Sequence, residues 1–229
     1  MDPNHLFFDS RLAGGCVYCG ATGNTRDHVP SRVLLDEPFP EDLPVALACA
    51  ACNVGFSLDE EYVACLIECV LCGSTDPAAV NRSKIRRLLT EKPGLISRIA
   101  ASRDQSPTDL AWKPEQHRVS NVVAKLARGH AAFELAESKL DEPDAISFLP
   151  LVSMSAHERQ RYLEYPLAEQ AGWPEIGTRA FVRTARGQSA EGWIIVQPGR
   201  YRYLVREEPE GLAVQFILSE YLACRVVWS

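Results

Sequence analysis

Four cysteines stand in two C-x-x-C pairs whose spacing suits a metal ion. The pairs are Cys16 with Cys19 and Cys49 with Cys52, and 29 residues separate them. Two such pairs can place four thiolates around one tetrahedral Zn²⁺. Because four thiolates leave no open coordination position, we expect this zinc to be structural. Its binding energy would stabilise a segment whose apolar runs are too short to build a large core.

Three further residues near these pairs have the chemistry of a hydrolytic site. Asp27 and His28 lie between the pairs, and Asn53 directly follows the last cysteine. Carboxylate and amide oxygens suit Mg²⁺ or Mn²⁺ better than they suit a metal that prefers thiolates. A neutral histidine beside such a cation can accept a proton from water near neutral pH. The alternative is that Asp27 and Asn53 only form turns and that His28 is an ordinary structural residue.

The order C-x-x-C, DHVP, C-x-x-C-N resembles the HNH nuclease superfamily, in the four-cysteine version of the endonuclease VII type. The resemblance covers residues 16–60. It implies a ββα-metal fold, in which a β-hairpin and a helix surround one divalent cation, Mg²⁺ or Mn²⁺. It also implies hydrolysis of DNA to 5′-phosphate and 3′-hydroxyl ends, with His28 as the general base and with Asp27 and Asn53 as ligands of the cation.

One position departs from that superfamily. Many of its members carry an asparagine shortly before the third cysteine, and this chain has Pro44 there. That asparagine is not a metal ligand, so the expected cation site is unaffected. We expect a backbone carbonyl, Glu41 or Asp42 to orient His28 instead.

The spacing of apolar residues predicts three longer helices, over residues 58–72, 78–91 and 115–138, and a shorter one after Pro93. Ser57 and Glu60 have the pattern of a capping box at the start of the first helix, and Gly73 is expected to end it.

After residue 140 the pattern changes to short alternating runs, which predict an antiparallel sheet. We expect the run FVRTA at residues 181–185 to be one of its strands. The fold class is therefore α+β. We divide the chain into a zinc-stapled ββα-metal nuclease module at residues 1–75, a helical basic segment at 76–140, and an α+β domain with an antiparallel sheet at 141–229.

The charge is uneven along the chain, whose net charge is −6. Residues 1–78 hold three Lys or Arg against twelve Asp or Glu, whereas residues 79–130 hold eleven against four. This balance argues against a protein that coats nucleic acid by bulk attraction, and it assigns any contact with DNA mainly to the middle segment. The densest basic cluster comprises Arg82, Lys84, Arg86 and Arg87. We expect it to contact phosphates; the alternative is that these residues only form a solvated helix face.

Three more cysteines, Cys65, Cys69 and Cys72, follow one another at helical spacing. With Cys224 they suggest a second metal site. Free cysteine also packs as a small hydrophobe, and the three share a helix face with apolar neighbours. We therefore expect them to be core residues.

No signal peptide is evident, and no apolar run approaches the ~18 residues that span a bilayer. We expect a cytoplasmic protein, in which paired cysteines bind metal rather than form disulfides. The function expected is that of a DNA endonuclease, an effector of a bacterial defence or restriction system delivered by a partner such as an NTPase or sensor subunit. The alternative is an inactive zinc-scaffolded module that binds nucleic acid or docks a partner.

Overall fold

A computed structural model describes residues 14–103, 112–164, 174–186, 192–208 and 211–229 of the chain. Its N-terminal part is a small antiparallel hairpin followed by two helices. Strand β1 (Thr25–His28) pairs with β2 (Val45–Ala48) so that Asp27 lies opposite Ala46. A short 3-10 turn, η3 (Arg32–Leu34), lies in the connection between the strands. Helices α1 (Ala50–Gly55) and α2 (Ser57–Cys72) follow β2 directly.

Helix α2 ends where the sequence predicts and begins differently. Gly73 takes a left-handed conformation, with φ of 67°, and closes the helix. The capping box at its start is not formed. Ser57 is already the first helical residue and donates to the carbonyl of Val54, and the Glu60 carboxylate binds Lys125 instead of the cap amide. A tertiary ion pair has replaced the local cap.

The middle of the chain is helical. The helix expected over residues 78–91 is broken into a 3-10 turn and an α-helix, because residues 80–82 are extended. The elements are η4 (Pro77–Ala79), α3 (Ser83–Glu91), α4 (Pro93–Ala101) and α5 (Gln116–Leu135).

The C-terminal part contains the expected antiparallel sheet, with five strands in the order β3-β7-β6-β5-β4. Its strands are β3 (Ala145–Pro150), β4 (Ile194–Gln197), β5 (Tyr201–Glu208), β6 (Gly211–Leu218) and β7 (Leu222–Trp228). A 3-10 turn η5 (Leu151–Ser153) and helix α6 (Ala156–Leu163) follow β3.

The prediction of a strand at residues 181–185 is wrong. This run lies in helix α7 (Arg179–Ala185), which begins where the Thr178 side chain accepts a hydrogen bond from the backbone N–H of Phe181. The run is too short for its periodicity to separate a strand from a helix, and the cap at Thr178 decides in favour of the helix.

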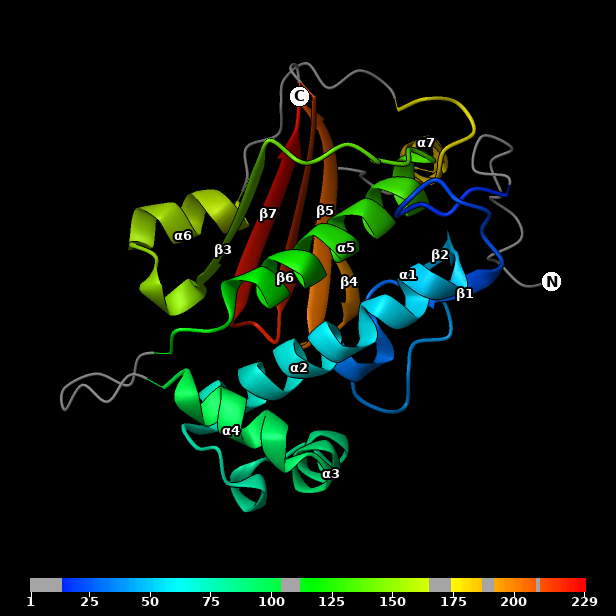
Figure 1. The fold of residues 1–229 in the computed structure, drawn as a ribbon. Helices are drawn as coiled ribbons and strands as arrows, with labels where there is room; N and C mark the ends of the chain where they lie inside the picture. The colour runs from blue at the N-terminus through cyan, green and yellow to red at the C-terminus, as the bar shows by residue number, and fades with distance from the viewer. Residues whose placement is uncertain (1–13, 104–111, 165–173, 187–191, 209–210) are drawn as a thin grey trace.

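Helix α5 crosses one face of the sheet, with α2 beside it and the N-terminal hairpin near its C-terminal half (Figure 1). Helix α6 covers the other face. The alternation of β6 explains this two-sided packing, because Val214 and Phe216 belong to the main core, whereas Ile217 packs with Leu151 and Ala223 near α6. No helix in the described ranges is both long and apolar enough to cross a membrane.

A single apolar core runs from the N-terminal segment to the end of the sheet, since Val17 and Trp228 belong to the same buried cluster. Partly buried ion pairs add to this contact. Arg82 and Arg200 both bind Asp36 and Glu68, with the closest nitrogen–oxygen distances between 2.5 and 2.8 Å at three of the four pairs. These pairs join the β1–β2 connection, helix α2, the start of α3 and the turn before strand β5.

Candidate metal centre and catalytic site

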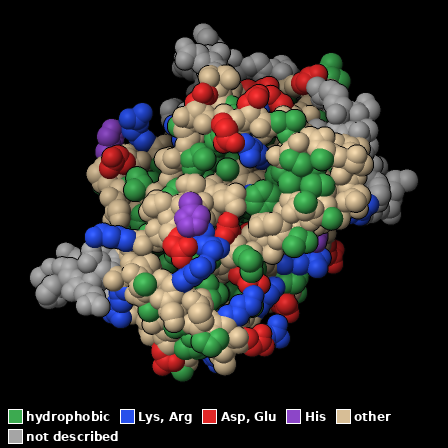
Figure 2. Space-filling model, viewed as in Figure 1, with side chains coloured by type: hydrophobic (Ala, Val, Ile, Leu, Met, Phe, Trp, Pro, Cys, Tyr) green, Lys and Arg blue, Asp and Glu red, His purple; other side chains and the backbone are tan. Residues whose placement is uncertain are grey.

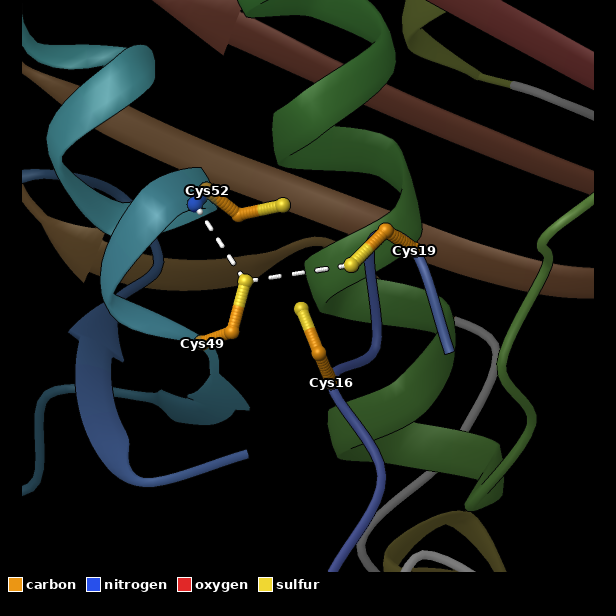
Figure 3. Close-up of side chains that lie close together, drawn as sticks. All are labelled: Cys16, Cys19, Cys49 and Cys52. Carbon is orange, nitrogen blue, oxygen red and sulfur yellow. Dashed lines mark hydrogen bonds between the residues drawn. The ribbon is translucent and has the colours of Figure 1, made fainter. Parts of the chain in front are cut away.

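The four cysteines of the two C-x-x-C pairs meet at one point. Cys16 and Cys19 come from the loop before β1, whereas Cys49 and Cys52 come from the start of α1, and all four side chains point toward one another (Figure 3). Their sulfur atoms lie within 4.8 Å of one another. The structure thus brings together residues that are 30 positions apart in the sequence.

The cluster has the dimensions of a tetrahedral zinc site. Zinc–sulfur bonds of 2.3 Å in tetrahedral geometry place the sulfurs about 3.8 Å apart, and Cys19 Sγ and Cys49 Sγ are separated by 3.8 Å. Cys49 caps helix α1, and the backbone N–H of Cys52 donates to its sulfur and lowers the pKa of the Cys49 thiol to about 7. A thiolate at this position is the form that binds metal. The cluster is therefore consistent with a zinc site.

Asp27 is held from the core side of the hairpin. Its Oδ2 atom accepts a hydrogen bond of 2.7 Å from the Tyr18 hydroxyl and lies 2.8 Å from Lys125 Nζ. The carboxylate is buried, and both of these contacts fall on the same oxygen atom. Lys125 also pairs with Glu60, at 2.7 Å, so one buried ammonium serves two carboxylates. Burial raises the pKa of Glu60, and the charge of Lys125 opposes that rise.

His28 is the next residue of β1, so its side chain lies on the opposite face of the strand from Asp27. It is half-buried, and burial together with the charge of Arg32 lowers its pKa below the ordinary value, while Asp27 opposes this. The imidazole is therefore neutral near pH 7. Within the described part of the chain its Nδ1 atom has no hydrogen-bond partner, and the Pro44 carbonyl accepts from Val29 N–H instead.

Asn53 lies on α1 against β1. Its Nδ2 donates to Thr25 Oγ1 at 3.2 Å and to the Arg26 carbonyl at 3.3 Å. These are the two residues that precede Asp27 and His28. The amide nitrogen is thus turned to the strand, and the amide oxygen takes no part in these two bonds.

The four basic residues predicted to contact phosphate have different environments. The Arg82 side chain is only 6% exposed and bonds to Asp36 and to the carbonyls of Val33 and Leu35, so it does not face a ligand in solution. Arg86 is exposed and donates to the Val80 carbonyl.

Lys84 and Arg87 line a groove of about 770 Å³ beside the start of α3. Arg87 is exposed, and Lys84 is half-buried, with its Nζ 3.4 Å from the Arg32 carbonyl. Arg32 and Lys84 both lie over the ring of Phe39, each 5.3 Å from its centre. Basic side chains therefore continue from the neighbourhood of His28 to helix α3.

Two residues of this region, Lys125 and Arg32, are not identified from the sequence as parts of a site. Lys125 lies 97 residues after His28, and in the sequence it is only a lysine on the face of a predicted helix. Arg32 follows the DHVP segment closely, and that proximity was the available signal.

The other cysteines are core residues, as predicted. Cys65, Cys69 and Cys224 are fully buried and Cys72 is half-buried. Burial raises the pKa of the Cys65 and Cys69 thiols to about 12, which keeps them protonated and poor metal ligands. In the described ranges only the cluster of the two C-x-x-C pairs has the geometry of a metal site built from His, Cys, Asp or Glu.

Comparison with known proteins identifies no relative: no family profile, no curated protein and no solved structure matches this chain.

Proposed function

We propose that this protein is a metal-dependent DNA endonuclease of the HNH type, with a ββα-metal site on a zinc-stapled hairpin. In this proposal the zinc-binding cysteines are structural, His28 is the general base, and Asp27 and Asn53 hold a Mg²⁺ or Mn²⁺ ion. The observation that carries it is the position of Asn53, whose side chain bonds to β1 at the two residues directly before Asp27 and His28.

The donor set fits a hard cation. Tyr18 and Lys125 both contact Oδ2 of Asp27, and Asn53 uses its amide nitrogen toward β1. Asp27 Oδ1 and Asn53 Oδ1 would therefore be the ligand atoms. A divalent cation held there would stabilise the charge that develops on the phosphate and on the departing 3′ oxygen.

His28 has the protonation state that the reaction needs. Its lowered pKa keeps a ring nitrogen free to take a proton from a water molecule as that water attacks phosphorus. The P–O bond to the 3′ oxygen then breaks, which leaves a 5′-phosphate and a 3′-hydroxyl. The charge of Arg32 favours the neutral imidazole and would also attract the phosphate.

The groove beside α3 is the proposed path of the nucleic-acid backbone. Lys84 and Arg87 supply cations along it and Arg32 lies beside Lys84, although Asp36 and Glu37 also line the groove. Basic and acidic side chains are mixed over the described part of the face that Figure 2 shows. Such a surface favours local contact with a few phosphates over broad electrostatic coating.

The decisive experiment is nicking of supercoiled plasmid by wild-type protein and by His28→Ala, with Mg²⁺, Mn²⁺ or chelator. We expect His28→Ala to lose roughly 10²- to 10⁴-fold in rate, because only the base is removed. Zinc content and DNA affinity should stay unchanged. His117→Ala is the matched control, since that imidazole is 73% exposed on α5 and should not affect cleavage. A His28→Ala protein that cuts at the wild-type rate would refute the mechanism.

One observation favours a second candidate, a zinc-scaffolded module that binds nucleic acid without cutting it. The Asp27 carboxylate already pairs with a buried lysine, which would be a sufficient structural role. Such a protein would shift DNA in a salt-sensitive way and would not nick plasmid with any metal ion.

A further inference from the structure

Lys125 is the most deeply buried charge beside the proposed site. Its side chain has no exposed surface, although it lies on helix α5, far along the chain from the hairpin. The ammonium contacts Asp27 at 2.8 Å and Glu60 at 2.7 Å, and lies 3.4 Å from the His28 carbonyl. One side chain therefore touches both β1 and α2.

Burying this ammonium is costly, and stability alone does not explain it. Removing a lysine from water costs several kcal/mol, and apolar residues of similar size often replace buried ion pairs without loss of stability. On helix α5, the apolar residues Val122 and Leu126 are fully buried close to Lys125. A methionine could fill the same space. What it could not provide is a second donor to the Asp27 carboxylate.

The two donors on Asp27 fix the orientation of its carboxylate. Tyr18 and Lys125 both approach Oδ2, at 2.7 and 2.8 Å, and hold that oxygen toward the core. A carboxylate held by one oxygen can offer the other to a ligand without losing side-chain freedom at that step. The net charge of this group also favours a cation, because Asp27 and Glu60 carry two negative charges against the single positive charge of Lys125.

We propose that Lys125 is a positioning residue of the endonuclease site: it holds Asp27 Oδ2 so that Oδ1 faces the divalent cation. This inference rests on the proposed function. It also joins helix α5, and through it the C-terminal sheet, to the chemistry on the hairpin. Residues that hold a metal ligand in this way typically change metal affinity 10- to 100-fold when they are replaced.

The test compares Lys125→Met with Leu126→Ala, a neighbouring core variant that should lose stability without touching Asp27. Two quantities are measured on zinc-loaded protein: Mn²⁺ binding by electron paramagnetic resonance, and the Mn²⁺ concentration that gives half-maximal plasmid nicking. We expect Lys125→Met to raise both Mn²⁺ midpoints roughly 10- to 100-fold. Nicking should return at high Mn²⁺, and DNA affinity should be unchanged. Leu126→Ala should leave both midpoints at the wild-type value.

Tyr18→Phe is the second variant and decides the question if Lys125→Met does not fold. It removes only the hydroxyl, and the ring can keep its edge contact with Phe56. We expect a shift of the Mn²⁺ midpoints in the same direction. Midpoints that stay at the wild-type value in the folded variants overturn the role of Lys125 and leave the endonuclease proposal intact. A wild-type protein that binds no Mn²⁺ and cuts no DNA overturns both.

Discussion

At the scale of single residues, the environment of a charged side chain separates structural from ligand-facing roles. Arg82 directly precedes α3 and Arg87 lies on it. Arg82 is buried in ion pairs, whereas the Arg87 side chain is 70% exposed and lies 3.9 Å from Glu91. Exposed pairs of this kind contribute little to stability. Substitutions of the two arginines should therefore have their effects in different assays, of stability for Arg82 and of DNA binding for Arg87.

We predict that Arg82→Ala lowers the free energy of unfolding by about 3–5 kcal/mol, because Glu68 would keep a buried charge without one of its cations. Arg87→Ala should change it by less than about 0.5 kcal/mol. In DNA binding the order should reverse, with Arg87→Ala reducing the slope of log affinity against log salt by about one. Urea unfolding and a salt titration measure the two effects. An unchanged urea midpoint for Arg82→Ala would contradict the structural role.

At the scale of elements, the four-cysteine cluster joins two segments that lie far apart in the sequence. The loop carrying Cys16 and Cys19 meets the start of α1 at the four sulfurs (Figure 3). We predict that Cys49→Ser loses zinc and melts at a lower temperature, because three thiolates hold zinc poorly and the segment depends on it. Cys72→Ser is the control, because Cys72 lies outside the cluster. The Cys72→Ser protein should keep its zinc. Retention of zinc by Cys49→Ser would argue against the four-cysteine site.

The contact between helix α5 and the sheet has a pH dependence of its own. His130 stacks on Tyr203, with ring centres 3.7 Å apart, and its Nε2 lies 2.7 Å from the Tyr201 hydroxyl. Burial, with a smaller contribution from the charge of Lys125, lowers the pKa of His130 well below 6.5. The folded protein therefore cannot take up the proton that the unfolded chain binds below about pH 6.5.

Because the unfolded chain binds this proton more readily, acid favours the unfolded state. The contribution of His130 to stability is therefore lost as the pH falls below its unfolded pKa. We predict a loss of about 2 kcal/mol between pH 6.5 and pH 5 from His130 alone. The difference between wild type and His130→Gln, measured by urea unfolding at each pH, cancels the other titrating groups. A difference that does not change with pH would contradict the prediction.

The sequence predicts those parts of the fold that depend on local spacing. The two C-x-x-C pairs predict the sulfur cluster. Ser155 and Glu158 have the spacing of a capping box, and the structure forms that box at the start of α6. The residues Gln197-Pro198-Gly199-Arg200 have the pattern of a type II turn. The Arg200 N–H donates to the Gln197 carbonyl at 3.0 Å, and Gly199 has a φ of 73°. Each of these features is decided by residues close in sequence or by metal spacing.

The features that sequence reasoning missed depend on long-range contacts. Lys125 looks like a surface lysine until α5 is packed against β1 and α2. The guanidinium of Arg82 turns inward because Asp36 and Glu68 meet it there. Glu60 leaves its expected cap for the same reason, since Lys125 offers a buried charge partner. Periodicity carries no information on these pairings.

At the scale of the whole molecule, the hairpin depends on segments that come much later in the chain. Lys125 neutralises part of the charge under β1, and Arg200 reaches Asp36 and Glu68 from the turn before strand β5. We predict that a fragment of residues 1–75 does not fold, even with zinc, because Asp27 and Glu60 would be buried without their cation. An amide NMR spectrum of the zinc-loaded fragment tests this. A well-dispersed spectrum would show that the hairpin is independent of α5.

The position of Lys125 in the chain also determines when the proposed site can assemble during synthesis. The ribosome adds about 5–20 residues per second, and Lys125 Nζ must reach a hairpin whose His28 was made 97 residues earlier. The interval is on the order of 5–20 s at those rates. For most of it, a nascent chain already carries every cysteine of the metal cluster together with Asp27, His28 and Asn53, but not the lysine that holds the carboxylate. The site is thus completed only after Lys125 and most of the helical segment have left the ribosome.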